Sequence, residues 1–166
     1  MYRAEVREDF CECCAYCLLP ELLAGGQDNF ELDHFHPKSR PARIRDVHDF
    51  YNLYYSCHIC NHYKANSWPT AALEAIGCRF VDPCGEEFTQ HFQPERRGTW
   101  SPLTVAGQYA AERLRLNRLH LVQVRELLNE IAELRGQNYI DWNRPARDQI
   151  STLLPNGVPT LKEGQN

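Results

Sequence analysis

The sequence contains no run of about 18 consecutive apolar residues, the length that a membrane-spanning helix requires. The first residues are charged and lack the apolar stretch of a secretory signal. We therefore expect no membrane partner and a cytoplasmic location. A basic excess is also missing, because 18 lysines and arginines stand against 22 acidic residues and give a net charge of -4. This balance argues against nucleic-acid binding through bulk charge, although a local basic surface or a bound divalent cation could still dock a phosphate.

Repeats and low-complexity tracts are absent too, and 166 residues with 43% hydrophobic content are ordinary for a folded protein. The unusual feature is the presence of eight cysteines and seven histidines. In a reducing compartment, eight cysteines favour metal binding over disulfides. Five of the histidines lie between His34 and His62, so titratable and metal-ligating side chains are concentrated in one segment.

The apolar pattern predicts a mixed α+β protein. Alternating side chains predict strands at residues 30–35 and 52–55, and a short helix is expected from Cys57 to about residue 67. Further helices are expected at 70–76 behind a Thr70 cap, at 106–116, between an Asn117 cap and Gly136, and at 138–154. Residues 78–103 contain three prolines and are expected to be irregular, except for a short strand at 79–81.

Two C-x-x-C pairs, Cys14/Cys17 and Cys57/Cys60, can place four thiolates around one tetrahedral metal ion. The long interval between the pairs requires a hairpin or loop inserted between the two halves of such a site. The first pair has an alternative in Cys11 with Cys14. We prefer Cys14/Cys17 because the apolar residues and proline that follow provide a turn that packs.

Cys78 and Cys84 are left over by this assignment. We expect both to be buried as small hydrophobic side chains, with a second metal site as the alternative. Four arginines lie among glutamates on the helices expected near the C-terminus: Arg113, Arg115, Arg118 and Arg125. We interpret them as a solvated helix face, with a rim that contacts the DNA backbone as the alternative.

Adjacent acidic and imidazole groups occur at Asp33 and His34, at the end of the first predicted strand. Hydrolysis of a phosphodiester needs an activated water and a group that neutralises the phosphoryl charge. A neutral imidazole can supply the first, and a divalent cation held by oxygen ligands can supply the second. Asn61 directly follows Cys60 and can give an oxygen ligand opposite Asp33.

Residues 13–68 resemble the HNH endonucleases of the ββα-metal type. The shared pattern is C-x-x-C, then D-H-x-x-P-K-S, then N-L-x-x-x-C-x-x-C-N-x-x-K, carried here by Cys14/Cys17, Asp33 to Ser39, Asn52-Leu53, Cys57/Cys60, Asn61 and Lys64. The rest of the chain is similar, more weakly, to the longer HNH proteins found beside retrons and in Septu-like anti-phage systems, through Val81-Asp82-Pro83 and Leu116 to Leu121. One departure is Arg40-Pro41, which replaces the glycine pair often seen after the Pro-x-Ser segment.

The resemblance implies a role for each matching residue. His34 would be the general base, Asp33 and Asn61 would hold a catalytic Mg²⁺ or Mn²⁺, and Asn52 would brace the loop and help to orient the base. The substrate-binding residues would be Lys38, His62 and Lys64. The structural Zn²⁺ would be held by Cys14, Cys17, Cys57 and Cys60.

The resemblance also implies a small ββα-metal core with structural zinc at residues 1–69. A connecting segment at 70–103, a helical extension at 104–154 and a tail at 155–166 would follow. The expected function is hydrolysis of phosphodiester bonds in DNA, in anti-phage defence. The alternative is a zinc-stabilised nucleic-acid-binding or assembly subunit that is inactive without a partner, because the helical extension could dock an ATPase or a second copy of the chain.

Overall fold

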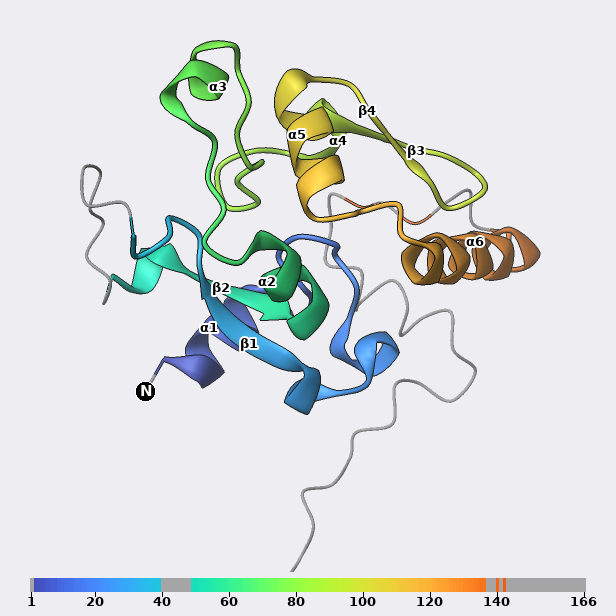
Figure 1. The fold of residues 1–166 in the computed structure, drawn as a ribbon. Helices are drawn as coiled ribbons and strands as arrows, with labels where there is room; N and C mark the ends of the chain where they lie inside the picture. The colour runs from blue at the N-terminus through green and yellow to red at the C-terminus, as the bar shows by residue number, and fades with distance from the viewer. Residues whose placement is uncertain (1, 40–48, 137–139, 141, 143–166) are drawn as a thin grey trace, which may run out of the picture.

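The protein has a mixed α+β fold in a computed structural model that describes residues 2–39, 49–136, 140 and 142 (Figure 1). Two small antiparallel sheets, each of two strands, are combined with short helices and one longer helix near the C-terminus. No helix in this described part is long and apolar enough to cross a membrane. The Arg40-Pro41 segment, most of the helix expected at 138–154 and the tail at 155–166 lie outside the described residues.

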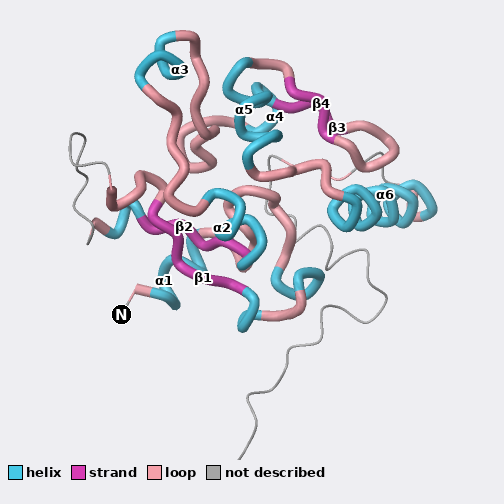
Figure 2. The backbone as a smooth tube through the Cα atoms, viewed as in Figure 1, coloured by secondary structure: helices cyan, strands magenta, loops and turns pink. Residues whose placement is uncertain are grey.

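The first sheet pairs β1 (Phe30–His34) with β2 (Leu53–Cys57), so that Phe30 lies opposite Cys57 and His34 opposite Leu53. Strand β2 runs directly into helix α2 (His58–Lys64), because Cys57 ends the strand and caps the helix. Helix α2 packs back against both strands (Figure 2). The two strands and the helix predicted from the sequence are confirmed, with slightly different ends.

The N-terminal segment packs onto this unit from the other side. Helix α1 (Arg3–Asp9) contacts β2, and two short 3-10 helices, η1 (Glu21–Ala24) and η2 (Gln27–Asn29), lead into β1. Another 3-10 turn, η4 (Phe50–Asn52), precedes β2. The loop after α1 is tied to the sheet by a hydrogen bond of 2.8 Å from the Ala15 amide to the Tyr55 carbonyl.

The middle of the chain differs from its prediction. Helix α3 (Ala71–Ala75) is confirmed, and the Thr70 hydroxyl caps it by accepting from the Leu73 amide. The strand expected at 79–81 is absent from this described segment. Helix α4 (Phe88–His91) and a hairpin of β3 (Phe92–Pro94) and β4 (Trp100–Pro102) are present instead. Strands of three residues are too short to show alternation, and each ends at a proline that would normally argue against a strand.

Helix α5 (Val105–Arg113) and helix α6 (Leu119–Leu134) complete the described fold. The prediction that Asn117 caps α6 is wrong, since Arg118 occupies the cap position. The Asn117 amide instead brackets Trp100, accepting from its backbone N–H at 2.8 Å and donating to its carbonyl at 2.9 Å. This bracket fastens β4 to the turn between the two helices.

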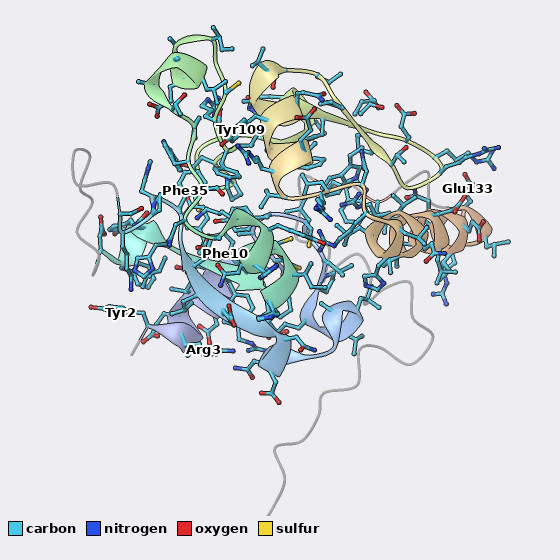
Figure 3. All side chains as sticks on the ribbon, in the orientation of Figure 1. Tyr2, Arg3, Phe10, Phe35, Tyr109 and Glu133 are labelled. Carbon is cyan, nitrogen blue, oxygen red and sulfur yellow. The ribbon has the colours of Figure 1, made fainter. Side chains whose placement is uncertain are left out.

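One hydrophobic core joins these parts, with buried members from Val6 to Trp142. Its largest fully buried side chains include Trp100, Tyr54 and Phe30. In Figure 3, Phe35 and Tyr109 lie inside the fold, whereas Glu133 lies at its edge. The core therefore connects the first sheet with the C-terminal helices.

Candidate metal centre and the adjacent cleft

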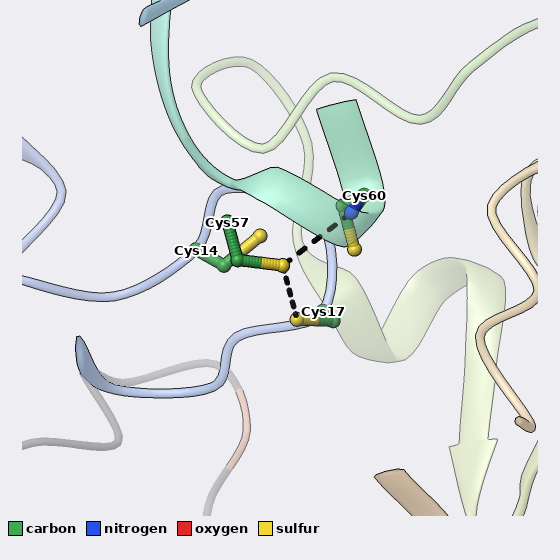
Figure 4. Close-up of side chains that lie close together, drawn as sticks. All are labelled: Cys14, Cys17, Cys57 and Cys60. Carbon is green, nitrogen blue, oxygen red and sulfur yellow. Dashed lines mark hydrogen bonds between the residues drawn. The ribbon is translucent and has the colours of Figure 1, made fainter. Parts of the chain in front are cut away.

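Four cysteine sulfurs converge in the interior, from Cys14, Cys17, Cys57 and Cys60 (Figure 4). All four ligand atoms lie within 4.8 Å of one another. Each of the four residues is at most 5% exposed. The predicted pairing of Cys14 with Cys17, rather than with Cys11, is confirmed.

Local backbone structure brings the two pairs together. The first pair lies on the loop after α1, where the Leu18 amide donates to the Cys14 carbonyl at 2.9 Å and closes a turn. The second pair lies at the junction of β2 and α2, where the Cys57 sulfur accepts from the Cys60 amide at 3.5 Å. The antiparallel sheet and the Ala15 hydrogen bond to Tyr55 then set the two turns face to face.

The geometry fits a tetrahedral metal ion with sulfur ligands. Zinc–sulfur bonds of about 2.3 Å imply sulfur–sulfur distances of about 3.8 Å, and the Cys17 and Cys57 sulfurs are 3.9 Å apart. The pKa of Cys60 is raised well above its usual value, because its sulfur hydrogen-bonds to Cys14, Cys17 and Cys57 and because burial disfavours the thiolate. Four thiolates can share this space when a cation compensates their charge.

Two arginines predicted to lie on a solvated face are packed inward. The Arg118 guanidinium donates to the Cys60 sulfur at 3.5 Å, and it lies 4.0 Å from the Cys57 sulfur. Arg125 is only 1% exposed, stacks 3.4 Å above the Trp100 ring, and has a pKa lowered to about 9 because burial disfavours its charge. The solvated-face interpretation is therefore wrong for Arg125 and incomplete for the half-buried Arg118, whereas Arg113 and Arg115 are exposed.

The other cysteines are dispersed. Cys13 is buried, Cys11 and Cys78 are half-buried, and Cys84 is exposed. The expected burial of Cys84 is therefore wrong. Across the described residues, the four-cysteine cluster is the one group of three or more acidic, histidine or cysteine side chains with converging ligand atoms.

A cleft of about 440 Å³ lies where β1 meets α2. It brings together five of the residues predicted for the site: Asp33, His34, Lys38, Asn61 and His62. The lining also includes Glu31 and His58, for which the sequence pattern predicts no role. Glu31 could have been found from the sequence, because residues two apart on a strand face the same side and Asp33 follows it at that spacing.

Asp33 is held in place by residues on the buried side of the cleft. It is 6% exposed, and its Oδ2 atom accepts hydrogen bonds from the Tyr16 hydroxyl and, at 2.8 Å, from the Lys64 ammonium. Burial and the neighbouring Asp33 charge raise the pKa of Tyr16 well above its usual value. Burial lowers the pKa of Lys64, and Asp33 opposes that effect.

Asn61 and Glu31 meet on the other side of the cleft. The Asn61 amide donates to Glu31 Oε2, and His58 Nδ1 lies 3.0 Å from Glu31 Oε1. These two contacts, His58 first and Asn61 second, lower the pKa of Glu31. The cleft thus presents the carboxylate and amide oxygens that hard divalent cations prefer.

Two predicted site residues lie outside the cleft lining. Asn52 is 2% exposed, accepts from the His36 amide at 2.8 Å and donates to the His36 carbonyl at 3.1 Å, so it braces the backbone just beyond His34. Lys64, predicted to contact phosphate, is fully buried and donates to the His34 carbonyl at 2.8 Å. Both residues support the end of β1 from within the fold.

Comparisons of this chain with protein-family models, with curated proteins and with solved structures give no match. A functional assignment therefore depends on the chemistry of the cleft and of the cysteine cluster beside it. The cleft and the cysteine cluster are neighbours, because Cys60 of the cluster and Asn61 of the cleft lining are consecutive residues of α2.

Proposed function

We propose that this protein is a metal-dependent endonuclease of the HNH type that hydrolyses phosphodiester bonds in DNA. The strongest support is the convergence of Asp33, His34 and Asn61 on one cleft. They come from β1 and α2, within a strand–strand–helix unit next to four clustered cysteines. These three residues combine a candidate general base, His34, with candidate oxygen ligands, Asp33 and Asn61. A purely structural metal site would need no general base. A role in anti-phage defence is part of the proposal through the sequence resemblance alone.

The four cysteines would hold a structural zinc ion, and Asp33 and Asn61 would hold Mg²⁺ or Mn²⁺. A divalent cation bound there would neutralise charge on the phosphoryl group and on the departing oxygen. His34 would take the proton of the water whose oxygen attacks phosphorus, while the bond from phosphorus to the 3′ oxygen breaks and that oxygen takes a proton from solvent water. Its backbone is immobilised, since Lys64 holds its carbonyl and Asn52 clamps the loop that follows.

Substrate would approach the exposed rim of the cleft. Lys38 and His62 line this rim and are both exposed, so they can meet a phosphate without being desolvated first. The net charge of -4 does not oppose this, because contact with phosphate depends on local charge and on the bound cation. DNA binding should accordingly weaken when the divalent cation is removed.

A plasmid-nicking assay tests the proposal. Zinc-loaded protein is incubated with supercoiled plasmid and Mg²⁺ or Mn²⁺, and the His34→Ala variant is compared with His120→Ala. His120 is an exposed histidine on α6 that does not line the cleft. We expect wild type and His120→Ala to nick the plasmid and His34→Ala to lose at least about 100-fold in rate. Absence of cleavage by wild type with either metal, with or without a partner, would refute the proposal.

A second function, as an assembly subunit, is favoured by one observation on α6. Three large apolar side chains of this helix face solvent, with Leu119 71%, Leu127 55% and Leu134 88% exposed. Light scattering of the zinc-loaded protein would show whether it forms a dimer. Cleavage that appears only after addition of an ATPase partner would assign the helical part to assembly.

A further inference from the structure

Three polar side chains form a buried group beneath the cleft. Lys64 is 0% exposed, and Asp33 and Tyr16 are each 6% exposed. An isolated buried carboxylate is strongly unfavourable, so its stability here depends on the donors that surround it. Both donors, the Tyr16 hydroxyl and the Lys64 ammonium, reach the same oxygen, Oδ2.

The second carboxylate oxygen is left for the cleft. Asp33 lines the cleft, and no hydrogen bond within the described part of the chain reaches its Oδ1 atom. A carboxylate oxygen offers lone pairs in two directions, so occupation of Oδ2 fixes the plane and rotation of the group. The two oxygens therefore have different roles, one in holding the side chain and one in meeting a ligand.

The two donors come from opposite halves of the cysteine cluster. Tyr16 lies between Cys14 and Cys17 in the first pair, and Lys64 lies on α2, which Cys57 caps and which contains Cys60. Assembly of the cluster thus brings both donors to Asp33. The same contacts explain why Lys64 is buried, since an ammonium group is seldom buried without a charged partner.

From this arrangement we infer that Tyr16 and Lys64 are positioning residues that set the affinity of Asp33 for a divalent cation, with opposite signs. Tyr16 orients the carboxylate without changing its charge, so it favours cation binding. Lys64 places a positive charge beside the ligand carboxylate, so it restrains cation binding and compensates Asp33 when the cleft holds no cation. This inference rests on the proposed function, because it assumes that Asp33 is a cation ligand.

Mn²⁺ binding to the full, zinc-loaded chain, measured from the EPR signal of free Mn²⁺ without DNA, tests the inference. We expect Tyr16→Phe to bind Mn²⁺ about 5-fold more weakly and Lys64→Met about 5-fold more tightly. Tyr63→Phe is the matched control, since Tyr63 neighbours Lys64 on α2 and its ring stacks with Arg115, and this variant should bind Mn²⁺ as wild type does. Zinc content and circular dichroism verify folding, and Lys64→Gln replaces Lys64→Met if the latter does not fold.

The outcomes separate two failures. If Asp33→Asn binds Mn²⁺ as tightly as wild type, Asp33 is not a ligand, and both this inference and the proposed metal site are overturned. If Asp33→Asn weakens binding but Tyr16→Phe and Lys64→Met leave it unchanged, only the positioning roles are overturned. Weaker binding in both Tyr16→Phe and Lys64→Met would show that the two residues act merely as supports, and this would also overturn the opposite signs.

Discussion

Replacement of Arg118 by methionine should weaken metal retention by the cysteine cluster. Four thiolates around Zn²⁺ leave a net negative charge, and hydrogen bonds from neighbouring groups stabilise such ligands. Arg118 supplies a donor at 3.5 Å from the Cys60 sulfur and lies 4.0 Å from that of Cys57. Burial disfavours the positive charge of Arg118, but the negative charges of the nearby cysteine sulfurs outweigh this effect, so the pKa of Arg118 is raised.

The magnitude follows from these contacts. A hydrogen bond to a charged group contributes about 1.5–3 kcal/mol. The contact to Cys60 is of normal length for a bond to sulfur, the one to Cys57 is long, and Arg118 is only half-buried. A loss of about 2 kcal/mol is therefore expected, equivalent to a zinc Kd about 30-fold weaker. Methionine retains most of the apolar stem, so the change removes the charge and leaves much of the packing.

Competition with a chelator of known zinc affinity measures this change. Arg115→Met is the control, because Arg115 is exposed and stacks on the same Tyr63 ring, at 4.7 Å against 5.9 Å for Arg118. Arg115→Met should retain zinc as wild type does. The reasoning fails if Arg118→Met also retains zinc with wild-type affinity, or if both variants lose the same amount.

Three further changes test other parts of the structure. Gly98→Ala, at a φ of +78°, would place a Cβ 2.1 Å from a backbone oxygen of α6, so we expect the free energy of unfolding in urea to fall by at least about 3 kcal/mol. The control Gly136→Ala, at a φ of +72° with nothing within 4 Å of the added Cβ, should lose about 1 kcal/mol. Equal losses in the two variants would contradict the close approach at Gly98. The pKa of Glu86 is lowered to about 2, mainly by hydrogen bonds from Arg79, so its contribution to stability is present above its usual pKa near 4.5 and is lost as pH falls toward 2. Between about pH 6 and about pH 3 the shift alone would give about 2 kcal/mol. After a discount for the partly exposed Arg79, wild type should lose about 1 kcal/mol more than Glu86→Gln, and parallel curves would disprove this role. Asn52→Ala removes two hydrogen bonds to a loop backbone and should lose about 2 kcal/mol of stability and, under the proposed function, nicking activity, whereas unchanged unfolding would show that the brace is dispensable.

Local signals made the first half of the chain predictable. Alternation over a few residues is enough to identify β1 and β2, and the C-x-x-C turn at Cys57 both ends a strand and starts a helix. Because Asn61 directly follows a cluster cysteine, its place beside β1, where it meets Glu31, follows once the two cysteine pairs come together. The strands and the C-x-x-C turn depend on residues that are neighbours in sequence. The position of Asn61 depends in addition on the convergence of the four cysteines on one candidate metal site.

The second half was harder to predict because its signals are weak or misleading. Strands β3 and β4 have three residues each, and Asn117, a good helix cap, hydrogen-bonds to Trp100 instead. Arginines on an amphipathic helix usually face water. Arg125 is buried instead, because its guanidinium stacks on Trp100 and donates to the backbone carbonyls of Gly98 and Leu116. None of these partners is close to Arg125 in sequence.

The sequence by itself determined the α+β class, the identity of the four clustered cysteines and the grouping of Asp33, His34 and Asn61. Each follows from short-range periodicity or from ligand spacing, which operate over a few residues. Tertiary structure alone decided that Lys64 is buried against Asp33, that Glu31 joins Asn61, and that Arg118 meets the sulfurs. Charged side chains have no intrinsic preference for burial, so their positions depend on which opposite charge the completed fold brings to them.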